Sequence, residues 1–534
     1  MKFVKIACYF LLTAFIPFVR ADIGWNLPSV AISPSTDDVK APPQVCCDSS
    51  GNAFAVWSAT LPITFDIVIQ ASYFDSTTLS WSYLGQVSDG AEPASNPSIC
   101  CDDSGNAFAV WQENSAQAVK ASRFDSSSMS WSTPVPLSGF SSDPSPQVCC
   151  DNSGNAIAIW IGISGINEVV QAARFNGTSW QPLVNLSAPL PDVIGPQVCC
   201  DNSGNANAVW TNNNGVSSTV QASHFNGSSW TAVVDVFSLS TPGQVLDGPQ
   251  ICCNESGNAF AVWSKLQGFD AIVQSSYFNG SSWTGADDVF ILSPSGQSSV
   301  IPKVCCDNSG NAIAIWVNFD FIDGNSVEAS RFNGSTWEPV GSGTPISPVG
   351  GDIISTQLCC DNSGNATAIW NLAIFPDATI QSANFDNTSL SWSSPLILST
   401  SGVLSTDPAI CCSDSGGKVA VWFAQGDPNG SIQGAYFLSE LPSPLTPPEN
   451  FSGARLTNRF PTQSTVSARL CWTPNIDPTV TSFNIYRNGH LITTISSSLS
   501  CYKDCNIDPC QSYIYSITSL NSSGDESNAE AIVI

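Results

Sequence analysis

Histidine and positive charge are both scarce in this sequence of 534 residues. The two histidines, His224 and His490, leave little room for histidine metal sites or for Ser-His and Cys-His catalysis. Lys and Arg total 16 against 43 Asp and Glu, so the net charge is −27, which argues against nucleic acid and anionic membranes as partners. Because charged residues make up only 11%, the chain is acidic without having the composition of a disordered polyelectrolyte.

Long apolar runs are missing except at the N-terminus, where Ile6 to Val19 follow two lysines. This run is too short to span a bilayer and has the position of a signal h-region, with a cleavage site after Ala21. Residues 1–21 are therefore predicted to be a signal peptide, with an uncleaved anchor as the alternative. Cleavage would remove Cys8 from the 21 cysteines and leave an even number, which favours disulfides over thiols. We expect a secreted or cell-surface protein without membrane insertion.

The feature that dominates the chain is an internal repeat marked by adjacent cysteines. A Cys-Cys pair recurs at intervals of 49 to 54 residues. The eight pairs are Cys46 and Cys47, Cys100 and Cys101, Cys149 and Cys150, Cys199 and Cys200, Cys252 and Cys253, Cys305 and Cys306, Cys359 and Cys360, and Cys411 and Cys412.

Each repeat predicts four antiparallel strands. The first carries Cys-Cys, and an Asp-x-Ser-Gly-Asn turn leads to a second that reads Ala-x-Ala-x-Trp with period two. The third reads Val-Gln-Ala-Ser-x-Phe, and an Asn-Gly turn joins it to a fourth that begins at Trp. Four-stranded units of about 50 residues are typical of a β-propeller.

A strand count indicates how this propeller closes. Only seven Trp-initiated fourth strands follow the eight Cys-Cys pairs, because the last repeat stops at Phe437. The segment Trp25–Ser33 matches Trp392–Ser399 and supplies the missing strand. The sequence therefore predicts an all-β fold, an eight-bladed propeller over residues 22–438 whose last blade is completed by the N-terminal strand.

The first hairpin of each repeat resembles the NHL type of propeller repeat. The run that begins at Cys150, Cys-Asp-Asn-Ser-Gly-Asn-Ala-Ile-Ala-Ile, matches that family's Val-Asp-x-x-Gly-Asn-x-x-Val pattern. The repeat here is longer, and Trp stands where that family usually has an acidic residue. The resemblance implies architecture only.

The C-terminal part has a different pattern. A Pro-rich linker, residues 439–449, precedes a segment, 450–534, that resembles a fibronectin type III domain. The resemblance rests on Leu470-Cys-Trp472, on Phe483-Asn-Ile-Tyr-Arg-Asn-Gly-His490 and on Tyr513 at the tyrosine-corner position. It implies a β-sandwich that serves as a spacer or ligand-binding module without chemistry of its own.

The pairing of the repeat cysteines has several solutions. Adjacent residues of a strand point to opposite faces, so each pair can bridge the preceding and the following blade, including a bridge between the first and last repeats. A vicinal bridge within each pair and free buried thiols are the alternatives, whereas Cys-Cys lacks the spacing of a zinc site. Among the four C-terminal cysteines we expect the pairs Cys471–Cys501 and Cys505–Cys510.

Recognition is expected on the face formed by the loops after the second and fourth strands, which are long and differ between repeats. These loops contain large apolar side chains that either pack locally or form an exposed patch for a protein partner: Phe65, Phe269, Phe319, Phe321 and Phe375. The leading hypothesis is a binding or adhesion scaffold that is not an enzyme, recognises a protein and needs no cofactor or metal. A monomer is expected.

Two other function classes remain open. A glycan-binding, lectin-like propeller would repeat pockets between its blades. A hydrolase or quinone-type oxidoreductase would need polar residues that converge at the axis. Arg123, Arg174 and Arg331 resemble a sialidase carboxylate clamp, but they occupy one repeat position in different blades and should lie apart. The Asp-box of sialidases is missing, and so is the tryptophan-docking spacing of the quinone-dependent alcohol dehydrogenases.

Overall fold

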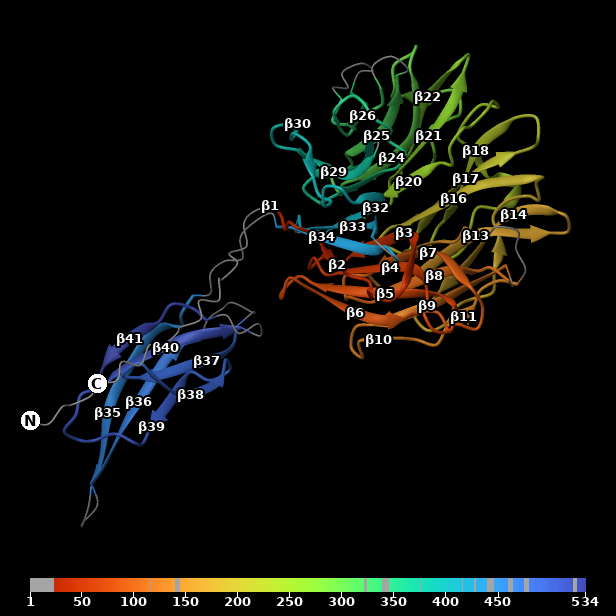
Figure 1. Cartoon of the computed structure of the whole chain (residues 1–534). Coiled ribbons are helices and arrows are strands. Elements are labelled where there is room, and N and C mark those ends of the chain that lie inside the picture. Colours follow the sequence, from red (N-terminus) through yellow and green to blue (C-terminus); the bar gives the residue numbers. More distant parts are fainter. Residues whose placement is uncertain are drawn as a thin grey trace, which may run out of the picture. The chain divides into compact units, whose positions relative to one another are not determined.

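The computed structural model divides the chain into two compact units, Met1–Ser439 and Glu440–Ile534 (Figure 1). The predicted signal peptide, residues 1–21, and most of the predicted linker lie outside the described residues. The described residues are 24–115, 117–139, 145–320, 324–338, 345–374, 376–414, 416–426, 429–438, 446–459, 464–474, 480–521 and 526–534.

The first unit is built from eight antiparallel sheets that follow one another along the chain. The first strands, which end on the Cys-Cys pairs, are β3 (Asp38–Cys47), β7 (Ala94–Cys101), β12 (Gln147–Cys150), β16 (Asp192–Cys200), β20 (Gln250–Cys253), β24 (Ser298–Cys306), β27 (Thr356–Cys360) and β32 (Leu404–Cys412). The second strands are β4 (Ala53–Thr60), β8 (Ala107–Glu113), β13 (Ala156–Ser164), β17 (Ala206–Asn213), β21 (Ala259–Gln267), β25 (Ala312–Phe319), β28 (Ala366–Ile374) and β33 (Lys418–Gln425).

The third and fourth strands form the other half of seven sheets, and the sheet that contains β24 and β25 has no fourth strand among the described residues. The third strands are β5 (Ile67–Asp75), β9 (Ala118–Asp125), β14 (Asn167–Phe175), β18 (Ser218–Phe225), β22 (Asp270–Phe278), β26 (Ser326–Phe332), β29 (Asp377–Asp386) and β34 (Ser431–Leu438). The fourth are β6 (Ser80–Gln86) and shorter pieces: β10 (Ser130–Trp131), β11 (Val135–Pro136), β15 (Val184–Asn185), β19 (Phe237–Ser238), β23 (Phe290–Ile291), β30 (Ser391–Trp392) and β31 (Leu396–Ile397). The short 3-10 helix η1 (Val233–Asp235) precedes β19.

The second strands form the core because each sheet packs between two neighbours. Their alternating alanines are fully buried, and so are all eight of their tryptophans, at 0–1% exposure. In four sheets the indole Nε1 donates to a glutamine Oε1 of the third strand, as from Trp160 to Gln171 at 3.0 Å. The small alanines leave room for these large side chains, which explains the Ala-x-Ala-x-Trp pattern.

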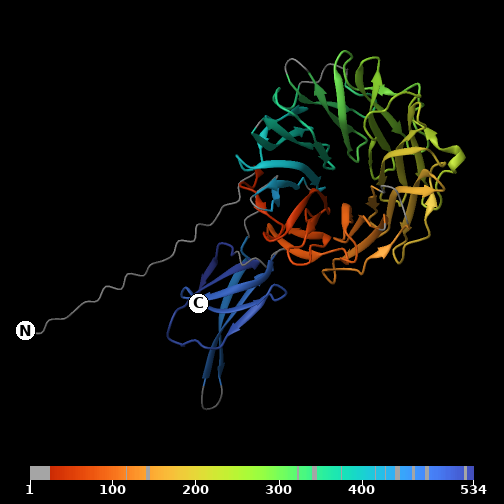
Figure 2. The ribbon, with the colours of Figure 1, turned by 45° about the vertical axis from the view of Figure 1, so that its right-hand side comes forward.

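The start of the chain pairs with the end of the first unit. The strands β1 (Gly24–Trp25) and β2 (Val30–Ala31) both pair antiparallel with β34, so that Trp25 lies opposite Phe437 and Val30 opposite Gly434. This is the pairing that the strand count predicts. In Figure 2 the sheets of this unit follow one another in a circle, and the red N-terminal strands lie beside the blue strands of the last sheet.

Disulfides join every sheet of the first unit to the next one. The first cysteine of each pair bonds to the second cysteine of the following pair, with Cα atoms 5.5 to 6.0 Å apart. The bonds are Cys46–Cys101, Cys100–Cys150, Cys149–Cys200, Cys199–Cys253, Cys252–Cys306, Cys305–Cys360, Cys359–Cys412 and Cys47–Cys411. Because Cys47–Cys411 joins the first and last repeats, the eight bonds form one covalent cycle.

The second unit contains two sheets. One has the order β35 (Glu449–Arg459), β36 (Ser464–Thr473) and β39 (Cys501–Asp504), and the other has β38 (His490–Ser496), β37 (Val480–Arg487), β40 (Ile514–Asn521) and β41 (Glu530–Val533). Trp472, Phe483 and Tyr515 pack in its core at 0–5% exposure. The described residues of the whole chain include no helix that could cross a membrane, and nine disulfides are typical of an extracellular protein.

The cysteines of the second unit correct one prediction. Cys471 and Cys501 lie opposite each other on β36 and β39 and form a disulfide. Cys505 and Cys510 are exposed and free, so the predicted bond between them is wrong. Other contacts fix the loop that separates them: Arg487 donates to the Asn506 carbonyl at 2.6 Å, and Arg455 donates to the Pro509 carbonyl at 2.8 Å. These hydrogen bonds hold the loop without a disulfide.

Candidate functional site

One position of the third strand faces the next sheet in every repeat. It immediately precedes the Phe near the end of that strand, and we call it the slot. Because successive side chains of a strand point to opposite faces, the slot residue lies on the face opposite to its neighbouring Phe. The slot residues are Tyr73, Arg123, Arg174, His224, Tyr277, Arg331, Asn384 and Tyr436.

Aromatic slot residues pack on the Phe of the following sheet. The ring centroid of His224 lies 4.8 Å from that of Phe278. Tyr277 stacks on Phe332 at 5.7 Å. In these two junctions the adjoining fourth-strand tryptophans, Trp283 and Trp337, are buried at 8% and 7% exposure. The aromatic slot therefore fills these two junctions, whereas Trp131 beside Tyr73 and Trp81 beside Tyr436 are half-buried.

Arginine slots make looser contacts. The guanidinium of Arg174 lies 5.6 Å from the ring centroid of Phe225 in the next sheet. Arg331 donates from Nη2 to Asn387 Oδ1 at 2.9 Å. Arg123 lies over the Phe108 ring of its own sheet at 5.8 Å, and its buried Nε has no acceptor among the described residues.

Each of the three arginines lines a cavity between its own sheet and the next one. The Arg331 pocket, of about 620 Å³, is lined on the next sheet by Phe385 and Trp392. The Arg123 pocket, of about 700 Å³, reaches Phe175 and Trp180. The Arg174 pocket, of about 570 Å³, reaches Phe225 and Trp230. All three pockets thus repeat one arrangement around the unit.

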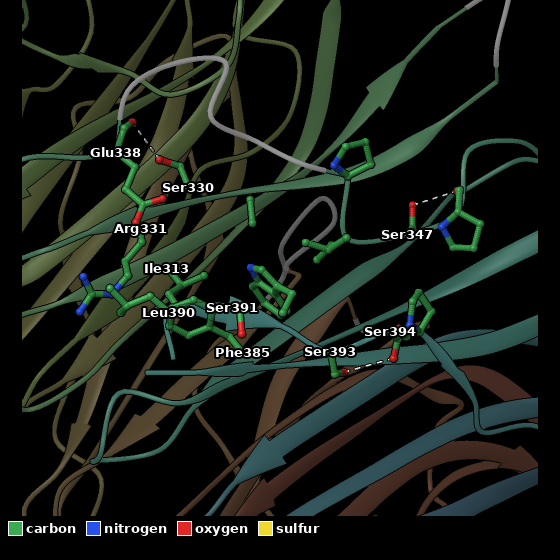
Figure 3. A pocket seen from close by; sticks show the side chains of 16 residues that line it. Ile313, Ser330, Arg331, Glu338, Ser347, Phe385, Leu390, Ser391, Ser393 and Ser394 are labelled. Carbon is green, nitrogen blue, oxygen red and sulfur yellow. Dashed lines mark hydrogen bonds between the residues drawn. The ribbon is translucent and has the colours of Figure 1, made fainter. Parts of the chain in front are cut away.

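The wall on the next sheet is an aromatic pair with hydroxyl groups beside it. The Phe and Trp centroids lie 5.7 Å apart in the Arg123 pocket and 5.4 Å apart in the other two. All three tryptophans are half-buried, so part of each indole faces the cavity. Figure 3 shows the Arg331 pocket, with Arg331, Ser330 and Glu338 on one side and Ser391, Ser393 and Ser394 on another. Each pocket therefore combines an aromatic surface, hydroxyls and one guanidinium.

Only the arginine slots are cationic at neutral pH. Burial lowers the pKa of the His224 imidazole, so this ring is neutral. Burial, with smaller contributions from Asp75 and Asp48, raises the pKa of Tyr73 to about 12. Burial also raises the pKa of Tyr277 and Tyr436. A guanidinium stays charged throughout this range.

Of the five predicted binding residues, Phe65 and Phe269 lie in hairpins between second and third strands, and Phe319 ends β25. Phe65 and Phe269 are exposed, at 76% and 102%. Phe319 is half-buried and packs against the core that its sheet shares with the next one. Phe321 and Phe375 lie outside the described residues. The protein-binding face therefore stays a prediction.

The Phe65 hairpin and two other hairpins of the same kind expose further apolar side chains. Ile63 and Phe65 share one hairpin, and Ile63 is 87% exposed. Ile166 and Val216 are 98% and 96% exposed in the equivalent hairpins of two further sheets. We call the five exposed apolar side chains of these hairpins and of the Phe269 hairpin the apolar tips: Ile63, Phe65, Ile166, Val216 and Phe269.

The short turns, which join the first strand of each sheet to the second, bring carboxylates of different sheets close enough to repel one another. Burial, followed by repulsion from Asp103, Glu255 and Asp361, raises the pKa of the Asp414 carboxyl. No group of three or more His, Cys, Asp or Glu among the described residues has the geometry of a metal site. These turns therefore give no ground for a metal or cofactor site.

Sequence reasoning missed the three pockets. It predicted that Arg123, Arg174 and Arg331 lie apart, and each does line a separate pocket. It did not foresee that the next sheet supplies each arginine with its own Trp. One sequence signal was available, because these are the only three arginines between residues 24 and 438, and all occupy the slot.

Comparison with known proteins identifies no family for this chain. No family model matches the sequence, and no curated protein matches it. Similar solved structures include a fungal alcohol oxidase in complex with copper, at 11% identity and a TM-score of 0.38, covering 81% of this chain and 95% of that one. A polysaccharide lyase is 7% identical with a TM-score of 0.41 over 63% and 88%. An α-L-arabinofuranosidase from Fusarium graminearum is 8% identical with a TM-score of 0.34 over 65% and 93%.

These comparisons correct the prediction that the chain is not an enzyme. The solved structures that it resembles include an oxidase, a lyase and a glycosidase, so the exclusion of enzymatic activity is contradicted. A binding role that excludes catalysis likewise has no support. TM-scores below 0.5 transfer none of these activities to this chain.

Proposed function

We propose that the first unit is an eight-bladed β-propeller that binds saccharides in pockets between successive blades. The β-propeller reading is supported by eight consecutive sheets, by the pairing of β1 and β2 with β34, and by the cycle of eight disulfides. The observation that carries the saccharide proposal is the recurrence of one lining, an aromatic pair with hydroxyls and a guanidinium, in three junctions.

The chemistry of the lining suits a sugar. One face of a pyranose ring presents C–H bonds, which pack against the electron-rich face of an indole. The sugar hydroxyls need hydrogen-bond partners at the rim, and Ser and Thr hydroxyls both donate and accept. In the Arg174 pocket, Ser228, Ser229 and Thr231 lie beside Trp230. An aromatic wall with a few placed polar groups is typical of small-molecule sites.

Several weak binding sites on one unit can together bind a ligand tightly. Three pockets on one rigid unit can engage several units of one polymer or several chains on a surface. The second binding event is then effectively intramolecular, so avidity exceeds the affinity of any single pocket. This suits an extracellular protein that holds on to a glycan-covered surface.

The second unit fits a fibronectin type III domain in this proposal. It has three strands in one sheet and four in the other, with Trp472 in the core. The Tyr513 hydroxyl accepts from the Asp508 N–H at 2.9 Å, the kind of contact that a tyrosine corner makes. We assign it the role of a spacer.

A glycan array followed by titration calorimetry tests the saccharide proposal. The test variant carries Trp180→Leu, Trp230→Leu and Trp392→Leu. Loss of three indole surfaces should weaken saccharide binding at least about tenfold. The matched control is Trp81→Leu, because Trp81 packs on Phe74 at 5.4 Å in a junction whose slot is a tyrosine. Absence of binding to any glycan, or undiminished binding by a triple variant with normal melting, would contradict the proposal.

A protein partner on the long-loop face is a second candidate function. The apolar tips favour it, because single-residue exposures of 76% to 102% recur at equivalent hairpins. Replacing Phe65 and Phe269 with serine should remove binding to a partner cross-linked at these hairpins and should leave saccharide binding intact. Retention of that partner by the double variant would exclude this face.

A further inference from the structure

The arginines of the first unit are confined to one repeat position. Every arginine between residues 24 and 438 occupies the slot, and each of the three lines a pocket. The chain has a net charge of −27, so carboxylates are abundant as potential partners. The ion pairs among the described residues nevertheless involve Lys40, Lys120 and Arg487, and none of the pocket arginines.

The three pockets differ in their own negative charge. Glu338 lines the Arg331 pocket, and Asp125 lines the Arg123 pocket. The Asp125 carboxyl has its pKa lowered by hydrogen bonds from Ser127, so it is ionised at neutral pH. The residues that line the Arg174 pocket include no carboxylate. Arg174 therefore gives this pocket a positive charge that no carboxylate in its lining balances.

The guanidinium of Arg174 forms no hydrogen bond to other described residues and lies over the Phe225 ring, 5.6 Å from its centroid. Asp151 lines a separate small cleft with Arg174 and forms no ion pair with it among the described residues. Its Oδ1 accepts from the N–H groups of Ser153 and Asn155 at 2.9 Å, and its Oδ2 accepts from Asn155 Nδ2 at 2.8 Å. Unused donors of a guanidinium match the geometry of a carboxylate or sulfate.

We infer that the Arg174 pocket binds a sugar unit that carries an anionic group, with the ring on Trp230 and the anion on Arg174. This inference rests on the proposed saccharide function and adds the charge of the ligand. The Arg123 and Arg331 pockets, which contain a carboxylate each, take neutral units. The selectivity is local because charges farther apart than about 8 Å are largely screened at physiological salt.

Paired ligands that differ only in charge test the inference. The acidic probes are trisaccharides of galacturonate and of glucuronate, each compared with its methyl ester. A trisaccharide of galactose 6-sulfate, compared with the unsulfated sugar, distinguishes sulfate from carboxylate. Titration calorimetry of the full chain should show that at least one acidic probe binds about 10- to 100-fold more tightly than its neutral counterpart.

Two variants assign this preference to one pocket. Arg174→Gln should abolish the acid preference and retain binding of the neutral probe, and Arg174→Lys should restore part of the preference. Arg331→Gln is the matched control and should leave the preference unchanged. Equal binding of acid and neutral probes by the natural protein, or a preference that survives Arg174→Gln, overturns the inference while the saccharide proposal stands. Failure of every neutral and acidic saccharide to bind overturns both.

Discussion

Each repeat sheet has an inner half, its first and second strands, and an outer half, its third and fourth strands. The two halves differ in how much their residues vary between repeats. The first and second strands are uniform, with a Cys-Cys pair and a fully buried Trp in all eight repeats. The third and fourth strands vary at the slot, which holds Tyr, Arg, His or Asn. The fourth-strand tryptophans range from 7% exposed at Trp337 to half-buried at Trp180. The difference teaches that the inner half carries stability and the outer half carries chemical variety.

Truncating an inner tryptophan should have the largest effect on folding. Trp160→Ala removes a side chain with 0% exposure and leaves Gln171 without the indole donor. We expect a loss of about 3–5 kcal/mol in the free energy of unfolding, measured by denaturant titration with disulfides intact. The outer Trp180→Ala in the same sheet should cost clearly less. Equal losses at the two positions would remove the distinction between the halves.

Opening the disulfide cycle should have the next largest effect. The double variant Cys47→Ser and Cys411→Ser breaks the bond between the first and last repeats, which are 364 residues apart in sequence. We expect a loss of about 2–4 kcal/mol for the first unit. The control pair, Cys471→Ser and Cys501→Ser, should destabilise only the transition of the second unit. An unchanged first transition after the cycle is opened would show that closure contributes no stability.

The sequence predicts the inner half better than the outer half. The Cys-Cys and Ala-x-Ala-x-Trp patterns define strands directly, because burial on both faces restricts residue type. In the outer half, the match of Trp25–Ser33 to a fourth strand predicts the pairing with β34.

The pockets depend on which faces of neighbouring sheets meet. The sequence pattern within one repeat does not predict this packing between sheets. Arg174 and Trp230 are 56 positions apart and meet only through the packing of two sheets. The error over Cys505 and Cys510 has a similar origin, because distant Arg455 holds the intervening loop.

A smaller effect should come from pH through the inner half. Lys418 on β33 is 7% exposed, and burial lowers its pKa from the ordinary value of 10.5 to about 8. The unfolded chain therefore holds this proton up to a higher pH than the folded chain, and stability rises between pH 8 and about 10. We expect a gain of about 1–2 kcal/mol from Lys418 between pH 7 and 9.5. Above pH 10 the raised pKa of Tyr73 reverses the trend.

Lys418→Met should reduce this rise, whereas Lys40→Met at an exposed position should not. The measurement uses urea midpoints across pH 7 to 9.5. It is made in a Cys505→Ser, Cys510→Ser background, because thiolates exchange with disulfides at alkaline pH. An identical pH slope in the Lys418→Met protein would contradict the assigned pKa.

The smallest effect on folding is expected from the outer arginines. The triple variant Arg123→Gln, Arg174→Gln and Arg331→Gln removes half-buried side chains without ion pairs among the described residues. Its free energy of unfolding should stay within about 0.5 kcal/mol of the natural protein. Thermal melting would check this. A large loss of stability would mean that these arginines are structural and would count against a ligand role.

The most direct test of the account is a crystal structure of the protein with the acidic trisaccharide that binds most tightly. The account predicts a sugar ring against Trp230 with its anionic group on the Arg174 guanidinium. A saccharide bound instead at the apolar tips or among the short turns near Asp414, with the three pockets empty, would contradict the central claim that the outer halves of the sheets carry the function.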